Sequence, residues 1–274
     1  MATIAQQLLQ LATIKSNIKN AIEAKGETVG SDAFSTYATH IGNIQSGGGD
    51  NLPAFLKNEL TSIELPSGMT TVPAYAFYDK SSLTSITIPT SVTSIGDSAF
   101  MKCNGITNMV IHTGVTTIGA NAFNSMKNLT SITLPNSITS LGNSLLNGDS
   151  KLLSIKFPSL LTNIQGQICY SCTSLQTIDI GENVTTIGNN AFTNCFACNT
   201  IICRASTPPT VQSATFGNAA SNYIGKNVSG TKTLYVPKGK SSAYNTSYWG
   251  SVLLESTKCN FVIAELDTNG NIPT

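Results

Sequence analysis

The chain has 274 residues, enough for one or two domains with a sizeable buried core. Only 11% of the residues are charged and the formal net charge is +1, which excludes the strongly charged surface typical of proteins that bind nucleic acid or anionic membranes. No apolar run approaches the roughly 18 residues of a membrane-spanning helix, so membrane insertion is not expected.

The first 45 residues are predicted to form two helices. Apolar residues with alternating spacings of three and four define one face of the first helix, and two more widen it. That face consists of Ile4, Leu8, Leu11, Ile14, Ile18 and Ile22. After a break at "KGETVG", a second helix is predicted to begin at Ser31 or Asp32. Two such helices make a marginal core, so we expect them to pack on a partner, on copies of themselves, or on the rest of the chain as a cap.

The stretch "NIKNAIEAKGETVGSDAFSTYATHIGNIQ" resembles short N-terminal modules of bacteriophage and prophage tail proteins. Those modules read as a helix, the motif AI-x-x-KG, and a second helix ending in I-x-x-I. The resemblance implies attachment to other virion proteins, with the apolar face of residues 1–45 as the attachment or oligomerisation surface and a homo-oligomer such as a trimer. The poor match to a signal peptide agrees with synthesis in a host cytoplasm. Residues 46–51 form a glycine-rich linker.

A repeat with a period of 23 residues dominates the segment 52–204. Its first column contains Leu60, Leu83, Ile106, Leu129, Leu152, Leu175 and Cys198. Further apolar columns stand at the fourth, sixth, tenth and thirteenth positions of each unit. Each unit begins with an alternating segment such as "SITI", which is typical of a strand with one buried face. A unit this small cannot bury its apolar face alone, so the units must stack into a solenoid with a parallel sheet along one side.

Two further features recur in most units. A glycine at the fourteenth position marks a turn that is predicted to need an unusual backbone conformation. These glycines are Gly96, Gly119, Gly142 and Gly188. An Ala-Phe pair follows and is expected to carry its ring inward. The fourth and fifth units depart from this pattern, with Leu145-Leu146 and Ile168-Cys169 in place of Ala-Phe and Gln165 in place of glycine. We expect a local change of curvature or an altered binding surface there.

The unit L-x-x-I-x-I-P-x-x-V-x-x-I-G-x-x-A-F-x-x-C resembles the BspA-like leucine-rich repeat, which is common in surface and secreted proteins of gut bacteria and of some protists. The resemblance implies an α+β repeat solenoid with a parallel β-sheet on one face and an adhesive role. It carries over no catalytic residues.

Residues 205–274 are predicted to form a β/α cap, because the exposed end of a solenoid must be covered. A strand at residues 234–236 leads to a turn at Gly239 and a short helix from about Ser241. This helix is expected to place Tyr244, Tyr248 and Trp249 against the last coil. The segment also resembles the one that follows the repeats in many Bacteroides-type members of the family.

The residue types that carry chemistry are sparse. The seven cysteines are an odd number in a long chain, and Cys103, Cys172 and Cys195 share one repeat position with Met126, so we interpret them as small buried hydrophobic residues. The pairs "CYSC" and "CFAC" have C-x-x-C spacing, but their repeat positions differ and no histidine is near, which disfavours a metal site. Neither His40 nor His112 has an assignable carboxylate. We therefore expect neither an enzyme nor a cofactor.

Binding is the predicted use of the solenoid. The third and fifth positions of each unit should face outward as rows of short polar side chains. The fifth-position row toward its C-terminal end is the predicted contact region for a host surface protein or glycan, although these side chains could equally serve only to solvate the sheet. Its residues are Thr133, Lys156, Asp179 and Ile202.

Three hypotheses about the whole protein follow. The first is a bacteriophage virion structural protein of the tail or fibre that recognises a host. The second is a bacterial surface or secreted adhesin, and the third is a virion protein with a purely architectural role.

Overall fold

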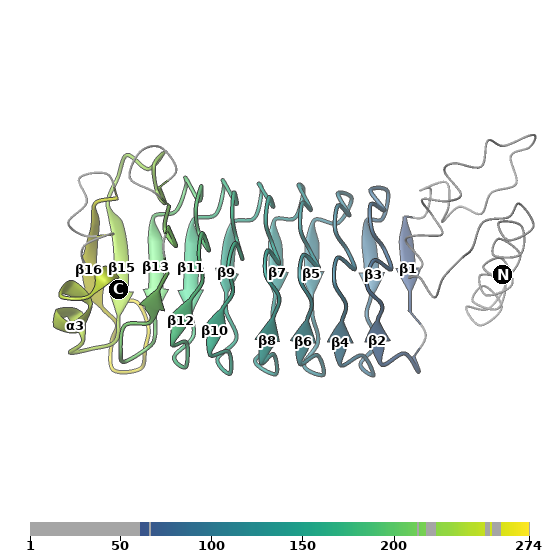
Figure 1. Ribbon diagram of the computed structural model, residues 1–274, viewed down its shortest axis with the longest axis horizontal. Coiled ribbons are helices and arrows are strands. Elements are labelled where there is room, and N and C mark those ends of the chain that lie inside the picture. Colours follow the sequence, from purple (N-terminus) through teal and green to yellow (C-terminus); the bar gives the residue numbers. More distant parts are fainter. Residues whose placement is uncertain are drawn as a thin grey trace, which may run out of the picture.

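The computed structural model describes residues 61–65, 67–212, 214–217, 223–249, 253 and 259–273. The predicted N-terminal helices and linker, with every residue of the proposed attachment face, lie outside the described residues. The described repeats form a row of similar coils that runs along the long axis of the molecule (Figure 1). We number the coils by the 23-residue period: coil 2 spans 83–105, coil 3 spans 106–128, coil 4 spans 129–151, coil 5 spans 152–174, coil 6 spans 175–197, and coil 7 begins at 198.

One strand per coil forms what we call the long-strand row, as the alternating segments predict. Its members from the coils are β1 (Ser62–Glu64), β3 (Ser85–Thr87), β5 (Asn108–Val110), β7 (Ser131–Thr133), β9 (Ser154–Lys156), β11 (Thr177–Ile180) and β13 (Thr200–Cys203). All pairing in this row is parallel and joins residues one period apart, such as Ile178 with both Ile155 and Ile201. Where strands pair, the register places the inward residue, an isoleucine or Met109, beside its counterpart in the next coil.

A second set of two-residue strands, the short-strand row, was not predicted from the sequence. It contains β2 (Thr71–Val72), β4 (Ser94–Ile95), β6 (Thr117–Ile118), β8 (Ser140–Leu141), β10 (Asn163–Ile164), β12 (Thr186–Ile187) and β14 (Thr210–Val211). Each strand is too short for its alternation to be recognised in the sequence. The hydroxyls of Thr93 and Thr116 donate to the carbonyl of the threonine one coil earlier, at 3.2 and 3.3 Å, and this adds to the backbone pairing.

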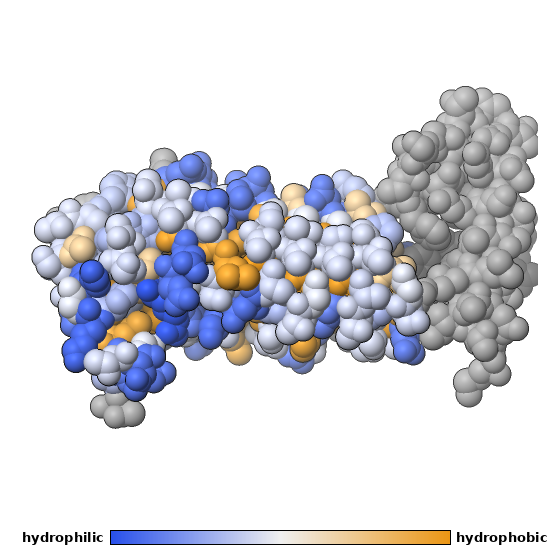
Figure 2. Space-filling model, turned by 90° about the horizontal axis from the view of Figure 1, so that it is seen from below, coloured by the Kyte–Doolittle hydropathy of each residue, from blue (hydrophilic) through white to orange (hydrophobic). Residues whose placement is uncertain are grey.

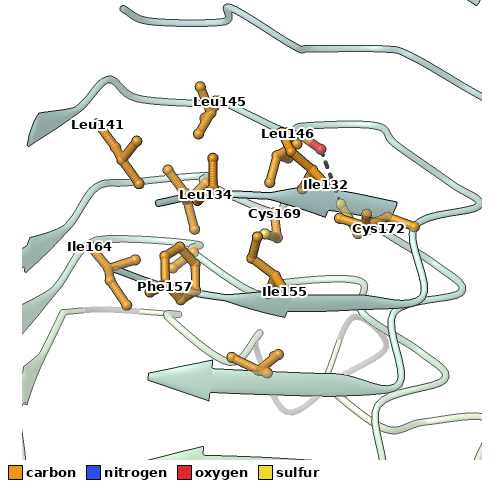
Figure 3. Close-up of a cluster of buried hydrophobic side chains, with 14 of the residues drawn as sticks. Ile132, Leu134, Leu141, Leu145, Leu146, Ile155, Phe157, Ile164, Cys169 and Cys172 are labelled. Carbon is orange, nitrogen blue, oxygen red and sulfur yellow. Dashed lines mark hydrogen bonds between the residues drawn. The ribbon is translucent and has the colours of Figure 1, made fainter. Parts of the chain in front are cut away.

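The interior between the two rows is filled by the predicted apolar columns. Phe77, Phe100 and Phe123 stack in line, with ring centroids 5.2 and 5.6 Å apart. In coils 4 and 5 the corresponding places are taken by Leu146 and Cys169, both fully buried. Phe157 stands at the sixth position of coil 5, and its ring lies in this part of the core (Figure 3). The centroids of the Phe157 and Phe192 rings are 6.2 Å apart. A large side chain from another column thus occupies interior space beside a small one.

The chain turns corners by means of single residues in the left-handed conformation. They occupy the sixteenth and twentieth positions of successive coils, for example Asn121 with φ 56° and Ser125 with φ 59°. Gly148, with φ 81°, takes the twentieth position in coil 4. Asparagine and serine tolerate this conformation better than bulky residues do, because their short side chains can bond locally to the backbone.

The fourteenth-position glycines have a different reason from the one predicted. Gly96, Gly119, Gly142 and Gly188 are not among the glycines with positive φ. A β-carbon on Gly142 would instead lie 2.2 Å from the backbone nitrogen of Ala120 in the preceding coil. The expected unusual conformation is therefore wrong. Glycine is needed because neighbouring coils approach each other too closely for any side chain.

The departure of coils 4 and 5 from the repeat coincides with a discontinuity that we call the seam. Strand pairing stops between β7 and β9 in the long-strand row and between β8 and β10 in the short-strand row. The long-strand row is also unpaired between β3 and β5, but there the short-strand row continues from β4 to β6. Other backbone bonds still cross the seam, including Leu146 N–H to Ile168 O at 2.9 Å and Gly148 N–H to Tyr170 O at 2.8 Å. The expected change of curvature or binding surface in these units stays a prediction, since the observed difference is one of strand pairing.

The C-terminal residues extend and close the solenoid. The strands β15 (Lys232–Val236) and β16 (Phe261–Glu265) add to the long-strand row beyond β13. The short helix α3 (Ser241–Asn245) follows the turn at Gly239, as predicted. Tyr244 donates to Ala205 O at 2.7 Å and Trp249 to Pro209 O at 2.8 Å, and both side chains are fully buried. Tyr248 is 55% exposed, so the prediction that it packs on the last coil is wrong.

Replacement of Gly142 by alanine should destabilise the protein by about 2 kcal/mol or more, since the added methyl group forces two coils apart. Gly68→Ala is the matched control, because no atom lies within 4 Å of a β-carbon built there, and it should change stability by less than about 0.5 kcal/mol. Equilibrium unfolding in urea measures both values. Equal effects of the two substitutions would contradict the close-approach explanation.

Candidate functional site

A regular exposed surface of the long-strand row lies on β3, β5, β7 and β9, and the exposed Ser62 and Glu64 of the adjoining β1 continue it. We call the part on β3 to β9 the exposed long-strand face. It consists of Ser85, Thr87, Asn108, Val110, Ser131, Thr133, Ser154 and Lys156, whose side chains are all exposed. Backbone pairing joins β5 to β7, and the Ser131 hydroxyl donates to Asn108 Oδ1 at 2.6 Å, so part of the face is held in place before any partner binds.

This face differs from the predicted contact region in its position along the row. Thr133 and Lys156 are exposed, as expected for residues that touch a partner. The expected exposure of Asp179 and Ile202 is wrong, because they are only 8% and 7% exposed. The accessible part of the fifth-position row thus lies toward the N-terminal side of the predicted region.

Cross-strand neighbours account for much of this burial. Asp179 pairs with Ile202 on β13, and Ile202 pairs in turn with Tyr235 on β15. Strands in a sheet lie about 4.8 Å apart, so adjacent large side chains cover one another. The sequence did not identify β15 as the next strand of the row, and this left Ile202 as an apparent end residue.

Arg204 also covers the Asp179 carboxylate. Its Nε and Nη2 donate to the two carboxylate oxygens at 2.7 and 2.9 Å, in a bidentate ion pair. Its Nη1 donates to Gly270 O at 2.6 Å. The Asp179 carboxylate raises the pKa of Arg204 further above its usual value. Sequence analysis treated Arg204 only as the point where the period stops, because no local pattern links it to residues far away in the chain.

The turn that contains Gly270 is organised by Asp267. Its Oδ1 accepts from the backbone N–H groups of Asn269 and Asn271, both at 2.8 Å, and backbone donors in this turn hold the pKa of Asp267 below its usual value. Arg204 therefore ties an ordered C-terminal turn to coil 7. Asp179 is best interpreted as the anchor of this attachment.

The exposed long-strand face has few charges and few bulky groups. Lys156 is its one charged residue, with Glu64 exposed beside Thr87 on the adjoining β1, and Val110, at 71% exposure, is its main apolar side chain. Such a surface can donate and accept neutral hydrogen bonds at little entropic cost, because short side chains have few rotamers. Figure 2 shows one side of the solenoid, where many side chains have intermediate hydropathy and the more strongly hydrophilic ones gather toward the C-terminal end.

The cysteines are buried free thiols, as interpreted from the sequence. Burial raises the pKa of Cys103 and of Cys198 to about 12. Thiols in this state are poor nucleophiles at neutral pH. Among the residues that the structure describes, no group of three or more His, Cys, Asp or Glu side chains is arranged to hold a metal ion. His112 Nδ1 accepts from Gly114 N–H at 3.0 Å, while His40 lies outside the described residues.

Comparison with protein-family models gives a match to the BspA type leucine-rich repeat region over residues 51–172 and 148–230. Together these ranges cover more than half of the chain. The chain belongs to the BspA-type leucine-rich repeat family. The parallel strands, the 23-residue register and the inward apolar columns are all accounted for by this membership.

Solved structures with similarity to this BspA-type protein include three leucine-rich repeat proteins. A leucine-rich repeat protein from Bacteroides ovatus is 23% identical with a TM-score of 0.46, over 66% of this chain and 56% of that one. One from Eubacterium ventriosum is 20% identical with a TM-score of 0.48, over 62% and 54%. A leucine-rich cell surface protein from Faecalibacterium prausnitzii is 22% identical with a TM-score of 0.43, over 70% and 63%.

The chain thus spans less than two thirds of the length of each of these three proteins. None of the curated proteins compared with it matches. In the described part of the chain, the length and hydropathy of the helices fall short of those of a membrane-spanning segment.

Substitution of Arg204 by alanine should destabilise the protein by about 2 kcal/mol, because it leaves the Asp179 carboxylate nearly buried without its partner. It should also free the C-terminal turn, which limited proteolysis followed by mass spectrometry would detect. Lys156→Ala removes an exposed cation and should change stability by less than about 0.5 kcal/mol. Unchanged stability of the Arg204 variant in urea would show that the ion pair does not anchor the turn.

Proposed function

We propose that this BspA-type protein is a binding protein of a bacteriophage virion, in the tail or a fibre, and that its solenoid recognises a protein or glycan on the host surface. The observation that carries the recognition part is the exposed long-strand face, a row of exposed and mostly polar side chains repeated from coil to coil. Solenoids use such extended surfaces for recognition. Binding, rather than catalysis, is the use that this arrangement of side chains favours.

The virion part of the proposal is supported by the N-terminal sequence. Residues 17–45 resemble modules of phage tail proteins, and the apolar face from Ile4 to Ile22 would contact other virion proteins or further copies of the chain. A trimer formed through this face would present several solenoids together and raise the overall affinity for a repeated surface ligand.

A bacterial surface or secreted adhesin is the second candidate. It is favoured by the family match, since BspA-type repeats are common in surface proteins of gut bacteria. The two candidates share the binding face and differ in where the protein resides.

Removal of the central polar groups of the face should weaken binding. The double variant Thr133→Ala with Lys156→Ala should lose at least tenfold in affinity for intact cells from a panel of gut bacterial strains, or for the best ligand on a glycan array. The matched control is Thr139→Ala with Lys238→Ala, which alters one exposed threonine and one exposed lysine outside the face. Equal binding by both variants would exclude the face, and no binding by the unchanged protein would favour the architectural role.

Location can be measured directly. Quantitative mass spectrometry of purified virions induced from the strain that carries the gene should find this chain at a fixed ratio to the major tail proteins. Light scattering of the full chain should give a homo-oligomer, and substitution of Leu11 and Ile14 by aspartate should convert it to a monomer. Recovery only from the bacterial surface fraction would favour the adhesin.

A further inference from the structure

A buried acid interrupts an otherwise apolar column of the core. The twenty-first position of successive coils holds Cys103, Met126, Asp149, Cys172 and Cys195. All five side chains are fully buried. Asp149 is thus a carboxyl group in a place where the neighbouring coils have sulfur, and it belongs to coil 4, on one side of the seam.

The three thiols of this column each make the same type of hydrogen bond. Each donates to the main-chain carbonyl of the eighteenth residue of the preceding coil: Cys103 to Phe77 at 2.9 Å, Cys172 to Leu146 at 3.0 Å, and Cys195 to Cys169 at 3.2 Å. Figure 3 shows the bond from Cys172 to Leu146. The repeat geometry gives Phe123 O as the acceptor that corresponds to Asp149.

The bonds around Asp149 agree with this correspondence. In the other coils the backbone N–H of the twenty-first residue donates to the eighteenth carbonyl of its own coil, as from Cys103 to Phe100 at 3.1 Å. Met126 N–H donates instead to Asp149 Oδ1, at 2.8 Å, so Phe123 O loses its usual donor. Asp149 Oδ2 has no hydrogen-bond partner among the described residues. A buried oxygen without a partner is costly unless it carries a proton to donate.

We infer that Asp149 is a neutral carboxylic acid in the folded protein, that its Oδ2 hydroxyl donates to Phe123 O in place of a thiol, and that its ionisation loosens the contact between coils 3 and 4. The protein would then contain a pH-sensitive joint. Loss of the proton removes the donor and leaves an anion in the core, where few charges are tolerated without a partner.

The surroundings of Asp149 favour the neutral form. Burial raises the pKa of Asp149 well above its usual value of 3.8, and the nearby Cys172 thiol raises it further, while the Met126 N–H lowers it to a smaller extent. The other titratable group that faces it is the Cys169 thiol, whose own pKa is raised by burial. The two thiols belong to coil 5 and the carboxyl belongs to coil 4, so the thiols lie on the other side of the seam from Asp149.

The sign of the pH effect follows from these directions. A carboxyl with a raised pKa in the folded state binds more protons when folded than when unfolded, at every pH above the usual carboxyl value. Stability therefore falls as the pH rises from about 4 toward the pKa of the folded state. The bond that ionisation would remove joins Asp149 of coil 4 to Phe123 of coil 3. Val110 of β5 and Thr133 of β7 lie on opposite sides of this junction, so its opening would divide the exposed long-strand face.

The test is urea unfolding of the full chain, under reducing conditions, at a series of pH values from 4 to 8. The ratio of folded to unfolded protein should fall by up to tenfold for each pH unit within the window above. Asp149→Asn keeps an acceptor for Met126 and a donor for Phe123 but cannot ionise, so this component of the pH dependence should disappear. Amide hydrogen exchange at Phe123 and Ser125, whose N–H groups donate to Leu145 O and Asn147 O of coil 4, should be faster in the wild type than in this variant at pH 8.

Two further variants complete the test. Asp97→Asn makes the same chemical change in an exposed carboxyl that accepts from a backbone N–H of a neighbouring coil, Ala120 N–H at 2.8 Å. This variant should keep the wild-type pH dependence. Asp149→Cys restores the thiol of the repeat and should match Asp149→Asn, which preserves the test if the asparagine variant does not fold. Parallel pH profiles of the wild type and the Asp149 variants would overturn the inference.

Discussion

The structure depends on the superposition of equivalent residues 23 positions apart. Each coil donates backbone hydrogen bonds to the coil beside it, as between Thr93 N–H and Thr70 O or between Thr116 N–H and Thr93 O. These bonds align every position of one coil with the same position of the next. A residue must therefore fit the pair of coils on either side of it as well as its own turn, and this is why the apolar columns are continuous.

Superposition also explains where the repeat tolerates variation. Four coils have glycine at the fourteenth position, where backbone atoms of adjacent coils nearly touch, while coil 5 has Gln165 there. The eighteenth position can change from phenylalanine to leucine or cysteine when a ring from another column lies in the adjacent space. In coils 2 to 6 the twenty-first position holds a buried cysteine, methionine or aspartate. Phe157 and Asp149 are two outcomes of this freedom, one that supplies volume and one that introduces a polar group into the interior.

The C-terminal end and the middle of the long-strand row differ in which outward side chains are exposed. Toward the C-terminus, β15, β16 and the turn held by Arg204 extend the sheet and cover Asp179 and Ile202. In the middle, β5, β7 and β9 keep both outward positions exposed. A partner that binds this surface would meet hydroxyl and amide groups with one cation, which favours recognition by shape and neutral hydrogen bonds over electrostatic steering.

The sequence by itself determined the repeat, its inward columns, the long strands and the helix that begins at Ser241, because each of these is written in local periodicity or turn chemistry. It also identified Thr133 and Lys156 as outward residues from the alternation of a strand. Only the tertiary structure decided the short-strand row, the role of the close-packed glycines, the seam and the burial of Asp179 and Ile202. Those features depend on distances between coils and on contacts such as Arg204 with Gly270, which join residues that no short stretch of sequence brings together.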